Sequence, residues 1–327
     1  MRRMLLVAAW CLLIGSATVS AQVLEAERLT TTEFAALDRA KTAVVVPGGI
    51  LEEHGPHLPS ASDTYQARWL ADALGRHIAL RPGWTALMLP MIPLGQSGAN
   101  DIARQFVYPA TITIRGATLR AVYMDLADAL GEHGFKFVFL VHIHGAPTHN
   151  QMLDQASEYF RETWGGTMVH LSGLKMVSEQ SEAPMALAAE ADRNADGFTV
   201  HAGLSEASRV LFARPESVRA SLFAASPLTG KDFADLVRLG KTDAWSGYWG
   251  APAGSSAWLG AALMGQSARL MGEVADAVIE GRPWPAEPFF TERTMGAEDI
   301  AISRAIEARE RTLVARQRAW LQKKGLE

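Results

Sequence analysis

Four short apolar runs, separated by segments of helical length, constrain the fold of this chain most strongly. The runs are rich in β-branched and large apolar residues, as is typical of strands buried on both faces of a sheet; they are Thr42–Pro47, Thr85–Pro90, Phe137–His142 and Thr167–Leu171. Helix-like segments lie between them, over 63–80, 116–133 and 150–163. Strands that alternate with such helices predict right-handed crossovers and a mostly parallel sheet covered on both faces. We therefore expect an α/β fold of three layers.

The N-terminal segment 1–21 has a different character. It carries Arg2 and Arg3, an apolar run from Met4 to Ile14 and a small-residue ending, Val19-Ser20-Ala21. The apolar run is well short of the roughly 20 residues that a membrane span needs, so the segment is interpreted as a cleaved signal peptide. This predicts a secreted or periplasmic protein with no stable membrane span after cleavage. A retained N-terminal anchor is the alternative.

The C-terminal segment also departs from the strand and helix pattern. Pro283, Pro285 and Pro288 form a linker, and a long charged helix follows from about Ala297 to Lys324. The chain is thus divided into a signal peptide (1–21), a principal domain (22–282) and a linker with a C-terminal helix (283–327). A narrow apolar stripe on this helix favours packing onto its own domain over binding a partner; it consists of Ile302, Ile306, Leu313 and Leu321.

Composition excludes several classes of function. Cys11 is the only cysteine, so signal cleavage would leave none for a disulfide, a thiolate metal site or a cysteine nucleophile. The whole chain has 31 basic and 35 acidic residues, and loss of Arg2 and Arg3 would make the mature protein more acidic still. This balance argues against nucleic acid as a partner.

The first polar cluster follows the first apolar run. Glu52 and His54 are two positions apart, so their side chains point the same way if the backbone is extended, and Asp63 follows nine residues after His54 at the start of a predicted helix. Carboxylates and imidazoles are ligands of divalent ions such as zinc and manganese. Alternatively, Asp63 caps the helix and the other two side chains are solvated loop groups.

Two further clusters contain histidine. His142 and His144 lie at the end of the most hydrophobic run. Ligands collect at the carboxyl ends of parallel strands, so these histidines are candidate metal ligands. Histidines in such positions can also be purely structural. His201 precedes a predicted helix start near Gly203, in a loop from which it can move protons, and Glu206 lies in the first helical turn. The alternative makes Glu206 a stabiliser of that turn and His201 incidental.

Together, these clusters resemble the creatininase family of metal-dependent amidohydrolases. Segment 52–59 with Asp63 is similar to the family signature Glu-x-His-Gly-x-His-Leu-Pro and its bridging aspartate. Further segments resemble family motifs in the same order from about Val44 to Gly260; they are Tyr108–Thr113, His133–Phe135 with the following strand, His201–Ser208 and Gly247–Pro252.

The resemblance implies a fold, a cofactor and a set of ligands. The fold is a three-layer α/β/α sandwich that usually assembles as a hexamer, so a homo-oligomer is expected. The cofactor is two divalent ions per chain, Zn²⁺, Mn²⁺ or Fe²⁺. Glu52 and His54 are each expected on a different ion, with Asp63 bridging them and His144 as a further ligand.

Departures from the family pattern lie around the second histidine cluster. His142-Ile143 replaces the family's Asn-Gly, so His142 is expected to face the substrate. Ala146 stands where creatininase itself has a metal-binding glutamate, and Glu206 is the candidate to replace that ligand. These departures point away from creatinine as the substrate.

The function that these features predict is hydrolysis of a cyclic amide, a formamide-like bond or a similar C–N bond in a small molecule by a metal-bridging hydroxide. His201 is the candidate to carry a proton to the leaving nitrogen. Trp249, with Trp245 and Tyr248, is predicted to cover a flat substrate, with packing in a core or interface as the alternative. Two other functions stay open: a catalytically inactive metal- or solute-binding protein, and a hydrolase of an ester, lactone or peptide bond. A serine hydrolase fits worse because the chain has no Gly-x-Ser-x-Gly motif.

Overall fold

A central parallel sheet organises the molecule. In a computed structural model, residues 22–291 and 295–326 are described, and the predicted signal peptide lies outside them. The sheet has the order β1-β3-β2-β4-β5, and all its paired neighbours are parallel. The strands are β1 (Gln22–Glu25), β2 (Thr42–Gly48), β3 (Thr85–Met88), β4 (Phe137–His142) and β5 (Thr167–His170). The four predicted strands are therefore confirmed, and β1 is an edge strand that the sequence analysis missed.

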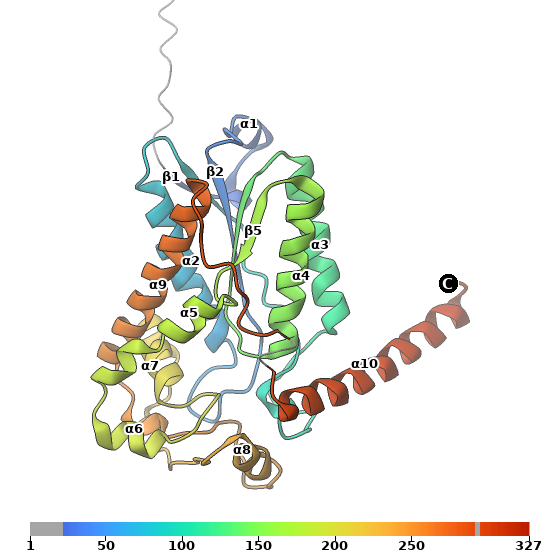
Figure 1. The fold of residues 1–327 in the computed structure, drawn as a ribbon. Coiled ribbons are helices and arrows are strands. Elements are labelled where there is room, and N and C mark those ends of the chain that lie inside the picture. Colours follow the sequence, from blue (N-terminus) through green and yellow to red (C-terminus); the bar gives the residue numbers. More distant parts are fainter. Residues whose placement is uncertain (1–21, 292–294, 327) are drawn as a thin grey trace, which may run out of the picture.

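Helices cover both faces of the sheet, which gives the predicted three-layer α/β/α architecture (Figure 1). The long helices α2 (Ser62–Ala79) and α9 (Ala257–Ile279) pack on one face, and α3 (Gly116–Glu132) and α4 (Pro147–Trp164) pack on the other. Each interface is an apolar core. Val45 of β2 faces the α2 and α9 layer, whereas Val44 and Val46 face the α3 and α4 layer. This alternation is why β2 is apolar after its first residue, Thr42.

Shorter helices build the region beyond the carboxyl ends of the strands. They are α5 (Lys175–Gln180), α6 (Glu190–Asp196), α7 (Leu204–Ala213) and α8 (Phe233–Gly240), whereas α1 (Thr31–Ala35) lies at the opposite edge. The described residues also contain six short 3₁₀ helices: Ala26–Arg28, Ala99–Asp101, Ala183–Leu187, Pro215–Ser217, Ala220–Ala224 and Pro252–Gly254. The start of α7 at Leu204 agrees with the predicted start near Gly203.

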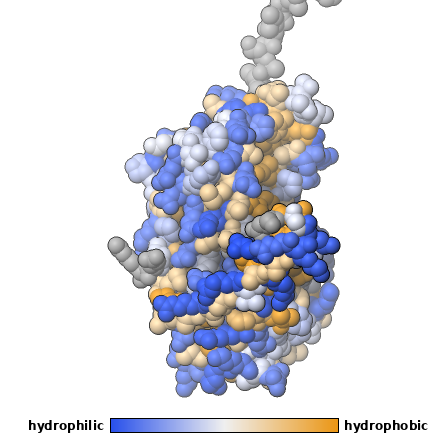
Figure 2. Space-filling model, turned by 90° about the vertical axis from the view of Figure 1, so that its right-hand side faces the viewer, coloured by the Kyte–Doolittle hydropathy of each residue, from blue (hydrophilic) through white to orange (hydrophobic). Residues whose placement is uncertain are grey.

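The C-terminal helix α10 (Ala297–Lys324) has the predicted bounds. Its first turns pack onto the domain, where Ile302 and Ile306 are buried, while Leu313 and Leu321 are only half-buried. The rest of the helix projects away from the body (Figure 1), and mostly hydrophilic residues cover the projecting end (Figure 2). The predicted packing of this helix on its own domain is thus confirmed only for its first turns. Across the described part of the chain, no helix is both long and apolar enough to cross a bilayer.

Candidate metal centre

Six side chains from four loops and helix starts converge beyond the carboxyl ends of β2 and β4. Two come from the loop after β2, one from the start of α2, one from the loop after β4 and two from the region where α7 begins; they are Glu52, His54, Asp63, His144, His201 and Glu206. Four of these residues are almost completely buried, and His144 and Glu206 are partly accessible. The structure thus brings together all six residues that were predicted to bind metal or carry protons.

The loop after β2 depends on a glycine for its shape. Gly55 has a φ of +70°, and a Cβ atom there would lie 2.9 Å from the ring of Tyr248. Both the backbone conformation and the close approach therefore favour glycine at this position. The turn holds His54 in the cluster.

The cluster contains two overlapping sets of three ligands that share Asp63. In the first set, His144 Nδ1 lies 3.1 Å from Glu52 Oε2 and 3.3 Å from Asp63 Oδ2. In the second set, His54 Nε2 lies 3.1 Å from Glu206 Oε1 and 3.6 Å from Asp63 Oδ1. Within each set the potential ligand atoms lie within 4.8 Å of one another. Asp63 therefore presents one oxygen to each set, as a bridging carboxylate does.

Backbone carbonyl groups fix the orientation of all three histidines. His54 Nδ1 lies 3.1 Å from the Glu52 carbonyl oxygen, and His144 Nε2 lies 2.7 Å from the Ser97 carbonyl oxygen. His201 Nε2 bonds in the same way to the Glu53 carbonyl oxygen. A carbonyl only accepts, so each of these nitrogens donates its hydrogen, and the other nitrogen of each ring faces the carboxylates. Metal-binding histidines are characteristically oriented by such outer bonds.

The electrostatics show that the cluster requires positive charge. Burial by itself would lower the pKa of His54, but the neighbouring Glu206 and Asp63 carboxylates raise it well above its ordinary value. Burial likewise opposes a charged His144, whose pKa Glu52 and Asp63 raise well above its ordinary value. Burial would raise the pKa of Glu52, yet the nearby histidines, His144 first, hold it at about 2. The carboxylates therefore stay ionised and attract protons or cations.

The same donor set fits a pair of divalent ions. Asp63 Oδ2 is buried and accepts no hydrogen bond, although an ionised oxygen in that position is costly without a partner. Two dications would satisfy this oxygen together with the inward-facing nitrogens of His54 and His144. Carboxylate and imidazole ligands suit zinc, manganese or iron. The predicted metal ligands Glu52, His54, Asp63, His144 and Glu206 lie close together in this donor set.

His201 lies beside the second set rather than clearly within it. Its Nδ1 is 3.8 Å from both Glu52 Oε1 and Glu206 Oε2, and its ring lies 4.4 Å from that of His54, centroid to centroid. With Glu52 and His54 it also forms a third possible set of ligands. The geometry therefore suits either a proton carrier or an additional ligand.

The two predicted substrate contacts are contradicted by this structure. His142 is fully buried, and its Nδ1 lies 3.1 Å from His149 Nε2 behind the cluster. The reason is that the ring of His149 packs against His142 at 4.6 Å between centroids and bonds to it, so His142 is paired within the core. Trp249 is also fully buried and packs against Trp245 at 4.7 Å between ring centroids. Packing in a core, the alternative for these aromatic residues, is confirmed.

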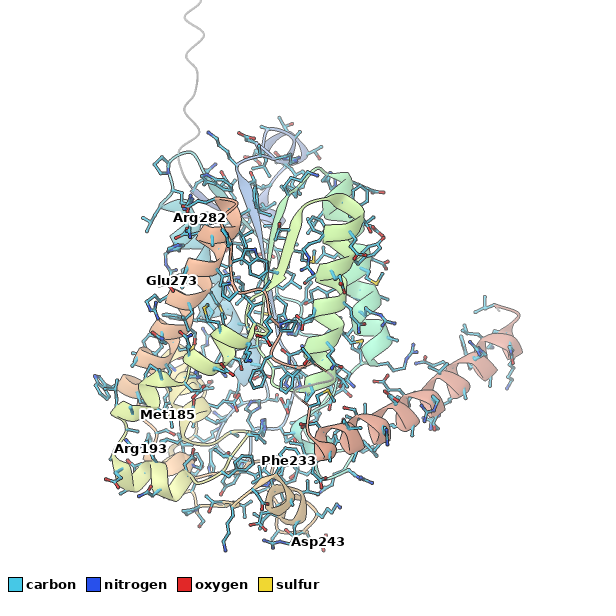
Figure 3. All side chains as sticks on the ribbon, in the orientation of Figure 1. Met185, Arg193, Phe233, Asp243, Glu273 and Arg282 are labelled. Atoms are coloured by element: carbon cyan, nitrogen blue, oxygen red, sulfur yellow. The ribbon has the colours of Figure 1, made fainter. Side chains whose placement is uncertain are left out.

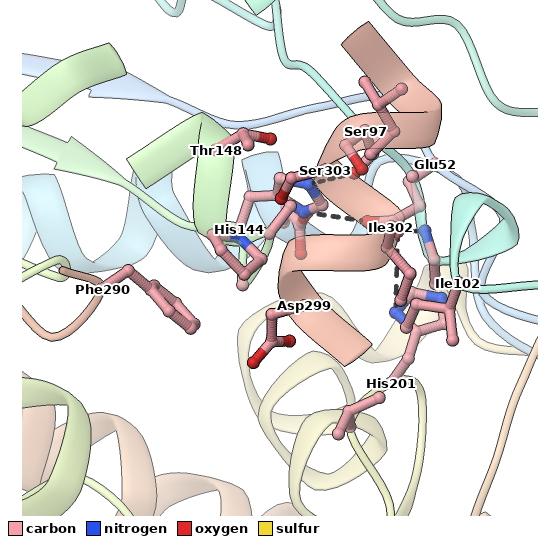
Figure 4. A pocket seen from close by; sticks show the side chains of 18 of the residues that line it. Glu52, Ser97, Ile102, His144, Thr148, His201, Phe290, Asp299, Ile302 and Ser303 are labelled. Atoms are coloured by element: carbon pink, nitrogen blue, oxygen red, sulfur yellow. Dashed lines mark hydrogen bonds and ion pairs between the residues drawn. The ribbon is translucent and has the colours of Figure 1, made fainter. Parts of the chain in front are cut away.

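Two cavities meet at the metal-ligand cluster. One, of about 320 Å³, is lined by the cluster residues and by the first turns of α10 (Figure 4). Ala146 lines this cavity and offers no ligand, so Glu206 is the carboxylate that completes the second set. The other cavity, of about 470 Å³, lies beside α5, α7 and α9 and also reaches Asp63, His144 and Glu206. The cluster can therefore be approached from two sides.

The sequence analysis missed the residues that surround the cluster. The backbone N–H of Ala99 donates to Glu52 at 2.5 Å, and that of Ala202 donates to Glu206 at 2.7 Å. The residues Asp299 and Ser303 of α10 line the smaller cavity. Backbone N–H groups are present in nearly every residue, so the sequence does not reveal which of them donate to the cluster. The α10 residues belong to a charged helix, and their contacts depend on the tertiary fold.

A buried acid next to the centre yields a prediction about pH and stability. Burial raises the pKa of Asp101 to about 7, against the opposing effect of Arg309. Because this folded pKa exceeds the unfolded one, stability from this group is present at low pH and is lost as pH rises through about 7. We expect Asp101→Asn to remove this loss. The free energy of unfolding of the variant should exceed that of the wild type by up to about 4 kcal/mol at pH 8. Thermal unfolding of the metal-free wild type and variant at pH 5 and pH 8 measures this difference. An equal difference in stability at both pH values would contradict the prediction.

Comparisons with known proteins place these features in context. A family model described as creatininase, creatinine amidohydrolase, matches residues 27–275. A mycofactocin precursor peptide peptidase of Mycobacterium ulcerans is 30% identical over 121 residues, which cover 34% of this chain and 44% of that protein. A creatinine amidohydrolase of Pseudomonas putida is 30% identical over 117 residues, which cover 36% of this chain and 43% of that protein. The matched segments thus span less than half the length of these curated relatives.

Solved structures of similar fold carry metals. A zinc-zinc form of a creatininase variant has a TM-score of 0.59 at 20% identity, covering 80% of this chain and 98% of that one. A manganese creatininase has a TM-score of 0.58 at 20% identity, covering 80% of this chain and 100% of that one. At this identity the likeness establishes the three-layer fold alone.

Proposed function

Since the chain belongs to the creatininase family, we propose that it is a metal-dependent amidohydrolase that holds two divalent ions and cleaves a C–N bond in a small molecule. The observation that carries this proposal is the pair of ligand sets that share Asp63. Glu52 and His144 complete the first set, and His54 and Glu206 complete the second. When bound, two such ions supply a water of lowered pKa and polarise a carbonyl oxygen.

The chain's own residues then orient the substrate and move protons. His201 has its Nε2 hydrogen committed to the Glu53 carbonyl, so its Nδ1 is the atom that can accept a proton beside the cluster. That proton can pass to a leaving nitrogen, which makes His201 the proposed general acid and base. His201 itself is mostly buried, which limits its contact with bulk water.

Replacement of His201 by asparagine tests this role. We expect the variant to keep two ions per chain and to lose about 10²- to 10⁴-fold in kcat, as is typical when a general acid and base is removed. Steady-state kinetics and metal analysis of the same sample provide the two measurements. Loss of one ion from the variant would instead identify His201 as a ligand.

The class of bond is the open part of the proposal. Cyclic amides and formamide-like bonds are the first candidates, and an ester or lactone would use the same attacking water. A peptide is a second candidate, because two relatives that match at 29–30% identity are mycofactocin precursor peptide peptidases. The competing proposal is a metal- or solute-binding protein that does not catalyse hydrolysis.

Metal analysis of the purified protein, followed by an activity screen, separates these functions. We expect about two ions per chain and hydrolysis of at least one amide after reconstitution with Zn²⁺, Mn²⁺ or Fe²⁺. The panel would contain lactams, formamides, short peptides, esters and lactones. Retention of a single ion with no hydrolysis in the whole panel would support the binding protein instead.

We also propose that the mature chain begins at Gln22, outside the cytoplasm, and assembles as a homo-oligomer, with a hexamer as the first candidate. The predicted cleavage site directly precedes β1, whose first residue pairs with Thr85. N-terminal sequencing of exported protein and light scattering of the purified protein test these two points.

A further inference from the structure

The C-terminal helix forms part of the wall above the candidate metal centre. The family match ends at residue 275, so the linker and α10 lie beyond it. Even so, Asp299, Ile302 and Ser303 of α10 line the same cavity as the ligand cluster (Figure 4). Any molecule that enters the smaller cavity therefore contacts residues outside the family-matched region.

Several contacts fix this wall in place. Ile302 and Ile306 are 9% and 5% exposed. One turn further, Glu310 Oε1 accepts hydrogen bonds from the Gly116 backbone N–H at 2.8 Å and from Gln96 Nε2 at 3.3 Å. The first of these bonds satisfies a free N–H at the start of α3. The first half of α10 is thus held by apolar burial and by hydrogen bonds to the domain.

The wall combines apolar side chains and a few hydroxyl groups with one acid. Phe233, which lies beyond the carboxyl ends of the strands at the start of α8 (Figure 3), and Phe290 of the linker contribute aromatic rings to the same cavity. Among the described residues that line it, there is no lysine or arginine, and Asp299 is the only charged group outside the ligand cluster. Asp299 Oδ2 accepts the Gly296 backbone N–H at 3.0 Å, which fixes the carboxylate at the start of α10.

We propose that α10 selects amide substrates with an apolar, ring-sized body that carries a cationic group, and that Asp299 pairs with this cation. The inference rests on the proposed function and adds the class of substrate to it. A carboxylate in a cavity that is also lined by aromatic rings favours an ammonium or amidinium group, through charge pairing and through contacts of the cation with ring faces. It disfavours anionic substrates for the same reason.

Binding of two small probes tests the inference without turnover. Benzyltrimethylammonium carries a cation that cannot coordinate a metal, and benzyl alcohol is a neutral compound with the same ring. Calorimetric titration of the metal-loaded protein would compare wild type with Asp299→Asn and with Glu298→Gln. Asparagine keeps an oxygen that can accept the Gly296 N–H, and Glu298 is an exposed neighbour that does not line the cavity.

We expect Asp299→Asn to weaken binding of the cation about tenfold, as for a partly buried charge pair, and to change binding of the alcohol less than twofold. Glu298→Gln should leave both affinities unchanged. Equal cation affinity in wild type and Asp299→Asn, or an equal loss in both variants, would overturn the inference.

Turnover separates this inference from the proposed function. If wild type hydrolyses no amide in the panel, the proposed function fails whatever the probes show. If it hydrolyses amides, cationic members should be preferred over neutral analogues, and Asp299→Asn should reduce that preference about tenfold. An unchanged preference in this variant would overturn the role of Asp299 while the proposed function stands.

Discussion

Replacement of Asp63 by asparagine is expected to abolish turnover while the protein stays folded. Asp63 presents one oxygen to each ligand set, at 3.3 Å from His144 and 3.6 Å from His54. An amide lacks the negative charge and has only one oxygen, so asparagine could serve at most one of the two ions and could not bridge them. We expect a loss of at least about 10³-fold in kcat/KM, because the attacking water depends on both ions. Kinetics with metal-supplemented buffer measure this loss.

The control for this variant lies on the same helix. Asp72 of α2 forms an ion pair with Arg68 at 3.0 Å on the surface, far from the ligand cluster. Asp72→Asn should keep full activity and two ions per chain, since exposed ion pairs contribute little. Circular dichroism should show the same helix content for both variants. Full activity of Asp63→Asn with two ions bound would contradict the bridging role and the two-ion proposal with it.

The fold was predictable where a strand carries its own apolar signal. The β2 sequence is apolar after Thr42 because helices cover both faces of the sheet, and this pattern alone predicts a buried parallel strand. β1 has no such signal. It consists of Gln22–Glu25, half of its residues are exposed, and it is a strand only because it pairs with the edge of β3. A short edge strand of this kind is set by tertiary pairing and not by local sequence.

The site was predictable to the extent that its ligands follow strands. Glu52, Asp63 and His144 lie at the carboxyl edge of the sheet, where parallel topology brings successive loops together. His142 shows the limit of that reasoning, because it also lies at a strand end but is fully buried and pairs with His149 in the core. Asp299 shows another limit. Its charge suits a solvated helix face, and only the packing of α10 against the domain places it in the cavity.

Replacement of Glu206 by glutamine has the second largest expected effect, because this residue is the proposed ligand that would complete the site of the second ion. Ala146 provides no ligand, and Glu206 Oε1 lies 3.1 Å from His54 Nε2. The His54 charge is the chief reason that the Glu206 pKa lies well below its usual value in spite of burial. A carboxylate held ionised beside an inward-facing imidazole is the ligand that a second ion requires.

Glutamine removes the charge while keeping the local hydrogen bonds. Its carbonyl oxygen can still accept the Ala202 N–H, and its amide group can donate to His54 Nε2, so the fold should be preserved. We expect metal content to fall from two ions to one and activity to fall at least about 100-fold. Glu216→Gln, which changes a surface ion pair with Arg214, should alter neither.

The joint behaviour of Glu206→Gln and His201→Asn then assigns the second ion. If Glu206 is the ligand, only the glutamine variant loses an ion, and both variants lose activity for different reasons. If Glu52, His54 and His201 form the second set instead, His201→Asn loses the ion and Glu206→Gln retains both. Because each variant is scored by metal content as well as by kcat, the ligand role and the proton-transfer role are separated even where both abolish turnover.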